Sequence, residues 1–398
     1  MSEKPLESGT TNFNQMNNLP LKISLHFSFF IVGIVTVLFG QIMPILAKSL
    51  SLNDEQAGFF ATSQFYGSII GTVSTAFLIK KIGFVRTLAI GFLLFVIGLS
   101  GVNIGGYEVS WASVCIYGIG FGLAIPSTLM LTAALNPIKT ASALNLMSFA
   151  WGIGAIVSQP FVSYFGGEKF TFPTLILVAI SLVFALVYLF LFDNISTQSQ
   201  TTETDSIKPV RIWSDPRAWL IVAFGLCDVG IESGISNWLT SYTMRSDLPQ
   251  AMSGLSATPI FFIFFVLGRG LAAILARFLS NNKIIWTSLT LTLLGTFLLM
   301  FSSGWQTIFF SAAVLGFGLA AVFPTNMARF TETFGAAANE KTVPLFVMGS
   351  VGSITITWLI GYFSNVYNSL SAGLGVLLGA AILLIVLQTV FQIQSKKA

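Results

Sequence analysis

The chain has 398 residues, of which 54% are hydrophobic and 9% are charged, and its mean hydropathy is +0.83. Soluble domains carry about 25% charged residues, so this composition excludes a soluble globular protein and indicates an integral membrane protein. The net charge of +4 does not indicate a nucleic-acid partner, because the basic residues are spread between the apolar runs and form no single patch.

Twelve apolar runs are each long enough to cross a hydrocarbon core of about 30 Å as a helix. Runs of this length favour helices over the short alternating strands of a membrane barrel, so we expect an all-α membrane protein with twelve transmembrane helices. The runs lie at 23–46, 57–79, 85–103, 109–133, 140–164, 171–192, 218–243, 253–276, 283–302, 305–330, 341–363 and 370–393.

Polar segments divide the chain into two halves of six runs. We expect 1–20 to be a cytoplasmic N-terminus without a cleaved signal peptide, and 21–192 to form the first six-helix bundle. The segment 193–217 is rich in Ser, Thr and Gln, which is typical of a flexible linker. A second six-helix bundle should span 218–393, followed by a cytoplasmic tail at 394–398.

Basic residues predict the orientation of the chain. If both termini lie on one side, fifteen Lys and Arg residues fall on that side and three on the other, with Arg269 inside a run. We count Arg329, at the end of the tenth run, among the fifteen. Cytoplasmic loops carry the excess of basic residues in membrane proteins. We therefore expect a multi-pass protein of a bacterial inner membrane with both termini in the cytoplasm.

The two halves repeat one glycine pattern. Gly118 and Gly120 in the fourth run correspond to Gly316 and Gly318 in the tenth, at an offset of 198 residues. The same offset pairs Pro126 with Pro324, Gly154 with Gly352, and Tyr164 with Tyr362. Two parallel six-helix repeats are typical of alternating-access transporters, whose site lies at the midplane between the halves.

Three charges lie well inside the apolar runs. Asp228 and Glu232 are spaced i, i+4 in the seventh run, which puts them on one helix face, and Arg269 lies in the eighth. Asp228 and Arg269 lie about 15 and 12 Å from the helix ends, which predicts an ion pair, structural or functional. Glu232 has no obvious cationic partner. Burial favours the protonated form of a carboxyl group, so Glu232, with Asp228 beside it, is the candidate proton carrier.

Amide and indole side chains at mid-depth are the candidate substrate contacts, since such groups hold hydroxylated solutes in cavities. They are Gln41, Gln64, Asn145, Trp151, Gln159, Asn237, Trp238, Asn326 and Trp358. Each also has a structural interpretation, as an interhelical hydrogen bond for the amides or an interface anchor for the indoles. We expect no metal site, because two cysteines inside apolar runs and one histidine form no ligand set.

Three stretches resemble the fucose/hexose:proton symporter group of the major facilitator superfamily. They are Gly268-Arg269 with Arg277, Asn136-Pro137 followed by Leu144-Asn145-Leu146, and Val229-Gly230-x-Glu232 with Asn237-Trp238-Leu239. The resemblance implies the major facilitator fold over the whole chain and symport of a solute with protons. It also favours Asn145 and Asn237 as substrate contacts.

The chain lacks acidic residues that the resembling family carries, including those implicated in proton coupling. The family's loop signature between the second and third helices contains an acidic residue, whereas this chain has Lys80-Lys81 in that stretch. The resembling symporters also carry acids in their first and fourth helices, and the corresponding runs here have none. Proton coupling would therefore depend on other residues, for which Glu232 and Asp228 are the candidates.

These observations predict a secondary active transporter of a small polar solute, such as a monosaccharide or polyol, coupled to protons. The alternative is an exporter of amphipathic compounds or an organic-anion carrier that uses Arg269 as its substrate anchor. An enzyme is not expected, because the chain lacks a nucleophile–histidine–acid set and a phosphate-binding glycine loop. We expect a monomer in the lipid bilayer, without a cofactor.

Overall fold

The computed structural model describes residues 19–136, 139–166, 169–192, 212–246, 255–302, 304–335 and 343–397, and within these ranges the chain forms helices and no strands. In chain order they are α2 (Leu19–Ser49), α3 (Asp54–Ile82), α4 (Phe84–Val102), α5 (Tyr107–Leu135), α6 (Thr140–Gly166), α7 (Thr171–Phe190), the short 3₁₀ helix η1 (Ile212–Ser214), α8 (Pro216–Met244), α9 (Thr258–Leu275), α10 (Asn281–Met300), α11 (Trp305–Leu319), α12 (Val322–Phe334), α13 (Val343–Tyr367) and α14 (Leu370–Lys397). Most of the predicted N-terminus and linker, residues 1–18 and 193–211, lies outside the described residues, as does Pro137.

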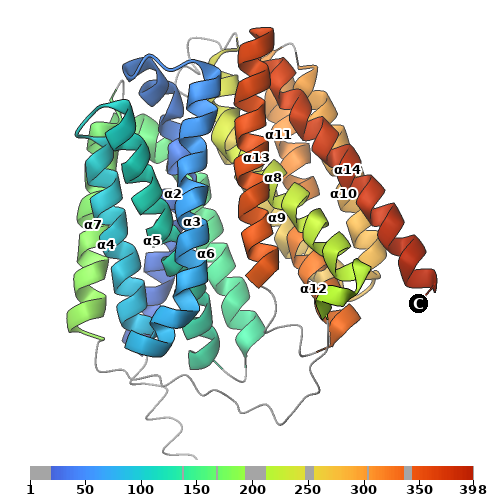
Figure 1. Cartoon of the computed structure of the whole chain (residues 1–398), viewed down its shortest axis with the longest axis horizontal. Helices are drawn as coiled ribbons and strands as arrows, with labels where there is room; N and C mark the ends of the chain where they lie inside the picture. The colour runs from blue at the N-terminus through green and yellow to red at the C-terminus, as the bar shows by residue number, and fades with distance from the viewer. Residues whose placement is uncertain are drawn as a thin grey trace, which may run out of the picture.

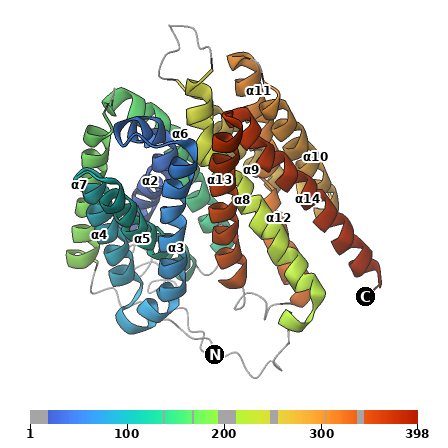
Figure 2. The same cartoon turned by 45° about the horizontal axis from the view of Figure 1, so that its top comes forward.

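Two bundles stand side by side, α2 to α7 and α8 to α14 (Figure 1). We call the face where α7 ends and α8 begins the linker face, and the face where α2 ends and α3 begins the far face. The bundles join through α2 with α8, α3 with α13, and α6 with α9. Both views show α3 and α13 side by side (Figure 1 and Figure 2).

Eleven membrane crossings in the described part are long and apolar enough to span a bilayer, with α11 and α12 together forming one of them. The one predicted crossing that is not among these eleven is the second in chain order, α3. This helix is 29 residues long, but its several Ser, Thr and Gln residues lower its hydropathy. The all-α membrane fold predicted from the sequence is therefore confirmed.

Two helix boundaries differ from the sequence prediction. The tenth run is interrupted at Ala320 and Ala321, between α11 and α12. Pro324 lies in the first turn of α12, where a missing backbone donor is tolerated. The last helix continues through the predicted tail to Lys397.

Local capping explains where two helices at the bundle interface begin. At the start of α3, the Gln56 backbone N–H donates to Asn53 Oδ1 (2.8 Å) and the Asn53 backbone N–H donates to Gln56 Oε1 (3.0 Å), which is a capping box. At the start of α8, Asp215 accepts from the backbone N–H of Arg217 (2.8 Å), and a proline occupies the first turn.

Equivalent glycines make equivalent contacts in the two bundles. A Cβ atom on Gly118 would overlap the backbone oxygen of Gln64, and one on Gly316 would overlap that of Phe261. The same relation holds between Gly154 and the backbone oxygen of Phe30, and between Gly352 and that of Leu226. The helices thus approach backbone to backbone at matching places, which confirms the internal repeat in three dimensions.

Candidate functional site

One stripe of α8 faces the other bundle. Ser236 and Thr240 lie four and eight residues after Glu232. A Cβ atom on Gly40 of α2 would overlap the Ser236 backbone oxygen, and Thr240 Oγ1 donates to Gln41 Oε1 (2.6 Å). Asp228 and Glu232 continue this stripe toward the linker face, because residues four apart share a helix face. Ser236 and Thr240 contact the N-terminal bundle, and we expect Glu232, one turn before Ser236, to lie toward the same side of α8.

The two carboxylates differ in their access to solvent. Asp228 is 1% exposed, and its Oδ2 atom is buried without a hydrogen-bond partner among the described residues. Glu232 is half-buried, and its side chain makes no hydrogen bond within the described part of the chain. Glu232 is therefore the more exposed of the two carboxylates.

Arg269 on α9 is held by aromatic rings. Its guanidinium lies 4.2 Å from the Phe265 ring centre and 5.9 Å from the Trp151 ring centre, and its Nε is buried without a hydrogen-bond partner in the described residues. The predicted Asp228–Arg269 ion pair is not formed in this conformation, since no nitrogen–oxygen distance of 4.0 Å or less joins them. The cation instead gains from the ring faces and interacts with both carboxylates at longer range.

Trp151 on α6 connects the two bundles near these charges. Its Nε1 donates to Thr36 Oγ1 (3.2 Å) within the N-terminal bundle, and its ring packs edge-on against Phe262 of α9, with centroids 6.1 Å apart. Gln64 Nε2 donates to the backbone oxygen of Thr36 (3.3 Å). The N-terminal bundle thus orients Trp151, and the indole ring lies beside Arg269 of the C-terminal bundle.

The far face is closed by polar contacts between the halves. Arg245, just after α8, donates to both carboxylate oxygens of Asp54 at 2.7 and 2.5 Å, and Ser364 Oγ donates to Asp54 at 2.5 Å. Asn365 Nδ2 donates to Glu55 Oε2 (3.4 Å). Hydrogen bonding to Asp54 raises the pKa of Arg245, so the arginine remains protonated under all conditions of a transport assay.

Glycines allow the same interface to close. A Cβ atom on Gly58 would lie 3.2 Å from the Gly361 Cα and 3.3 Å from the Trp238 ring. Trp238 is 2% exposed and donates to the backbone oxygen of Thr357 (3.0 Å). The hydrogen bonds that join Gln41, Asp54 and Glu55 to the C-terminal bundle all lie toward the far face. The protein is therefore in a state closed at the far face.

Breaking the Asp54–Arg245 pair should loosen this closure. The side chains are 18% and 48% exposed, so we expect Asp54→Asn to destabilise the closed state by about 0.5–1 kcal/mol. Spin labels on opposite halves of the far face would report a larger open population. Exchanging the charges, with Asp54→Arg and Arg245→Asp together, should restore closure. No change in Asp54→Asn, or no recovery in the exchanged pair, would show that the pair is not a latch.

The sequence-predicted substrate contacts separate into groups. Gln64 and Trp151 lie beside Thr36, near the charged residues, as described above. Gln41 and Trp238 lie instead in the closed contact between the halves. Asn237 is 6% exposed and donates to the Ser233 backbone oxygen of its own helix (2.9 Å).

The remaining four candidates lie elsewhere in the fold. Asn145 is exposed near the linker-face end of α6, and Gln159 is 3% exposed further along that helix. Trp358 is half-buried on α13 beside Tyr362, with ring centroids 5.4 Å apart. Asn326 donates to the Ile221 backbone oxygen (3.0 Å) inside the C-terminal bundle. The role of each as a substrate contact remains a prediction.

Sequence reasoning missed a second buried arginine. Arg329 was counted with the cytoplasmic loop charges, but it is 5% exposed inside α12 and contacts Asn326. Thr36, which positions Trp151, was not among the predicted substrate contacts. The pairing of Asn326 and Arg329 three residues apart on one helix face was the available sequence signal for the arginine.

Comparisons with known proteins agree with this fold. The model of the Major Facilitator Superfamily matches residues 25–342. A glucose/mannose transporter of Bacillus subtilis (strain 168) is 22% identical over 371 residues, which cover 90% of this chain and 91% of that protein.

Two solved structures are similar over nearly their whole length. The nucleoside transporter NupG superposes with a TM-score of 0.73 at 16% identity, covering 94% of this chain and 99% of that one. The fucose:proton symporter FucP of E. coli superposes with a TM-score of 0.63 at 16% identity, covering 94% and 98%. The chain therefore belongs to the Major Facilitator Superfamily and is a membrane transporter, not an enzyme.

Proposed function

We propose that the protein is a secondary active transporter that moves a monosaccharide or related polyol together with a proton. Alternating access between the two bundles would carry the solute across the inner membrane. The observation that carries the proposal is the position on α8 of the half-buried Glu232 and of Asp228, four and eight residues before Ser236, whose backbone packs against Gly40 of the N-terminal bundle. The similar glucose/mannose transporter and fucose:proton symporter support the solute class and the coupling ion.

Charge balance supports proton coupling with a neutral solute. Asp228, Glu232 and Arg269 together carry one negative charge when both acids are ionised. Unbalanced charge in a low-dielectric interior is expensive, so the site is most stable when one carboxyl group holds a proton. Of the two acids, Glu232 is the more accessible to water, and we assign the proton to it.

We assign the linker face to the cytoplasm, in line with the excess of basic residues on that side of the sequence. The closed far face is then periplasmic, and the state described above is the one that exchanges solute with the cytoplasm. Opening of the far face requires the Asp54–Arg245 and Gln41–Thr240 contacts to separate.

Uptake into proteoliposomes over a panel of labelled sugars, polyols, nucleosides and carboxylates, with and without an imposed pH gradient, tests this function. We expect accumulation of a neutral polyhydroxylated solute that rises with an inward proton gradient. Accumulation of a carboxylate alone, or equilibration that ignores the gradient, would contradict the proposal.

A second candidate function is that of an organic-anion carrier, and one observation favours it. The Arg269 Nε is buried without a partner, and no carboxylate lies within 4.0 Å of the guanidinium in the described residues. An anionic solute could use these donors. Thermal stabilisation of the purified protein by carboxylates, lost in Arg269→Gln and absent with sugars, would support this candidate over the sugar carrier.

Trp151 should contribute to solute affinity because its ring lies beside Arg269, with the ring centre 5.9 Å from the guanidinium. We expect Trp151→Ala to raise KM about tenfold, from the loss of one aromatic contact and one hydrogen bond, with a smaller effect on kcat. Trp151→Phe should recover part of the loss. Trp286→Ala on α10 is the matched control and should leave KM unchanged, because α10 packs against other helices of the C-terminal bundle. An unchanged KM in Trp151→Ala would contradict a solute contact at this ring.

A further inference from the structure

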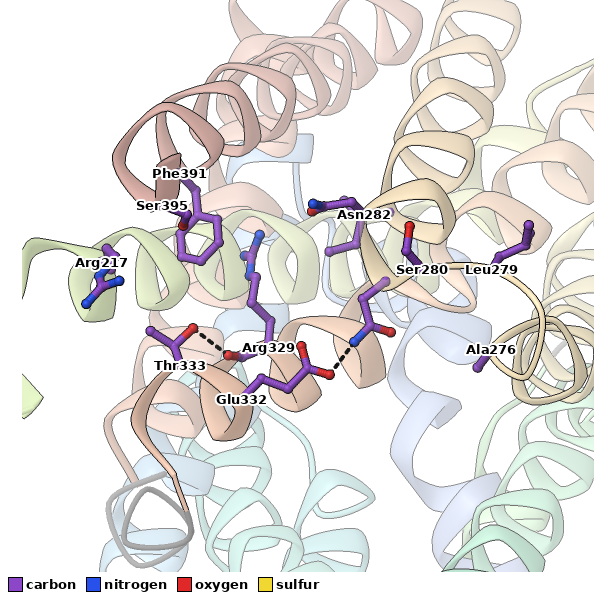
Figure 3. A pocket seen from close by; sticks show the side chains of 12 residues that line it. Arg217, Ala276, Leu279, Ser280, Asn282, Arg329, Glu332, Thr333, Phe391 and Ser395 are labelled. Atoms are coloured by element: carbon purple, nitrogen blue, oxygen red, sulfur yellow. Dashed lines mark hydrogen bonds between the residues drawn. The ribbon is translucent and has the colours of Figure 1, made fainter. Parts of the chain in front are cut away.

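A pocket of about 750 Å³ opens on the linker face of the C-terminal bundle, away from the site between the bundles. The beginnings of α8 and α10, the end of α14, and α12 all contribute to its wall. Figure 3 shows Arg329 in the middle of the lining, with Asn282 and Phe391 on one side of it and Glu332 on the other. None of these residues has a role in the transport mechanism proposed above.

Arg329 has unused donors in this wall. Its guanidinium lies between the rings of Phe224 and Phe391, 4.8 and 4.2 Å from their centres. Nη1 donates to Gln388 Oε1 (2.6 Å) and Nη2 donates to Asn326 Oδ1. The buried Nε has no partner among the described residues, and no carboxylate lies within 4.0 Å. An arginine has five N–H donors in a planar fork, so this buried cation has both donors and charge available to an anion.

The N-terminus of α10 faces the same pocket. Ser280, at the N-cap, makes no side-chain capping bond, and Ser280, Asn281 and Asn282 all line the cavity. The first backbone N–H groups of a helix lack intrahelical acceptors, and they carry a partial positive charge. The helix is 20 residues long, so this end adds to the attraction that Arg329 exerts on an anion.

The other charges of the wall do not cancel that of Arg329. Glu332 is exposed and accepts from Asn281 Nδ2 (2.6 Å), so its charge is screened by water. Arg217 is paired with Asp215 (2.7 Å), and both are 27% exposed. Arg329 is 5% exposed and is screened far less. The buried arginine therefore dominates the field inside the pocket.

We propose that this pocket binds an anionic phosphate group through Arg329 and the N-terminus of α10. Phosphate oxygens match the fork of an arginine and the N–H groups of a helix start. The group can belong to a phospholipid headgroup, because the pocket lies at the end of membrane-crossing helices, or to free phosphate. Both sources present the same phosphate oxygens to the pocket, and the experiment below distinguishes between them.

The test is thermal unfolding of the purified full chain in detergent, followed by tryptophan fluorescence. Sodium phosphate at millimolar concentration is compared with sodium chloride at equal ionic strength, and short-chain phosphatidylglycerol with a diacylglycerol of equal chain length. We expect a higher Tm with the phosphate-bearing probes. A shift with the lipid alone identifies the headgroup as the source, and a shift with both shows that free phosphate suffices. No shift with either overturns the proposal.

Two variants that remove charges of opposite sign from the pocket wall make the test specific. Arg329→Gln should abolish the shift, and Glu332→Gln, which removes a negative charge from the rim, should preserve or enlarge it. If Arg329→Gln does not fold, Asn282→Asp decides, because a carboxylate at the start of α10 should weaken the apparent affinity about tenfold. An undiminished shift in Arg329→Gln or Asn282→Asp would contradict the proposal.

Discussion

Glu232→Gln should abolish uphill, pH-driven accumulation of solute in proteoliposomes while exchange of labelled for unlabelled solute continues. The amide keeps the shape of the side chain but cannot take up or release a proton. With Glu232 neutral, Asp228 and Arg269 balance each other permanently, so the loaded carrier can cross between its two states without a proton. Exchange needs that crossing, whereas accumulation needs the proton as well.

Glu108→Gln is the matched control, since Glu108 is an exposed acid in the first turn of α5, away from the interface between the bundles. It should leave both accumulation and exchange unchanged. Parallel loss of accumulation and exchange in Glu232→Gln would make the residue a solute contact instead. Retention of both would remove it from the mechanism.

Gly40→Val should prevent closure of the far face and stop transport. A Cβ atom at Gly40 would overlap the backbone oxygen of Ser236, and packed helix backbones cannot move apart locally without separating the bundles. We expect the protein to fold, because each bundle keeps its own core, but to remain open at the far face. Transport and exchange should both be lost, since both require closure.

Spin labels at Ser49 and Ser246, on opposite halves of the far face, would report this opening in a background without Cys115 and Cys227. The distance distribution should shift to longer values in Gly40→Val. The control is Gly379→Val in α14, where a Cβ atom would meet nothing within 4 Å, and it should keep the wild-type distances and rates. Wild-type distances in Gly40→Val would show that the two halves do not close through this contact.

The helices and the internal repeat could be predicted because they depend on local patterns. Apolar runs mark membrane crossings, and glycines at matching offsets mark close helix contacts that recur in both bundles, as Gly118 and Gly316 show. The interruption of the tenth crossing at Ala320 and Ala321 has a local signal in Pro324, because a proline inside a helix removes a backbone donor and clashes with the carbonyl four residues earlier, which is that of Ala320. Hydropathy alone does not show the break, since both alanines are apolar and fit a continuous helix.

The site was harder to predict because it depends on contacts between distant segments. Asp228, Glu232 and Arg269 were found from the cost of charge in an apolar run. The missing ion pair follows from Phe265 and Trp151, whose rings hold the arginine. Gln41 and Trp238 were selected as polar or indole side chains at mid-depth, but they lie in the contact between the bundles at the far face. The sequence does not show in which conformation of the transporter this contact is closed.

Coupling between solute and proton movement is tested most directly with a pH-sensitive dye inside proteoliposomes that start without a pH gradient. Adding the transported sugar outside should acidify the lumen in the wild type, because each solute molecule brings a proton with it. The same addition should cause no acidification in Glu232→Gln, although labelled sugar still exchanges. Sugar entry without acidification in the wild type, or equal acidification in the variant, would contradict proton coupling through Glu232.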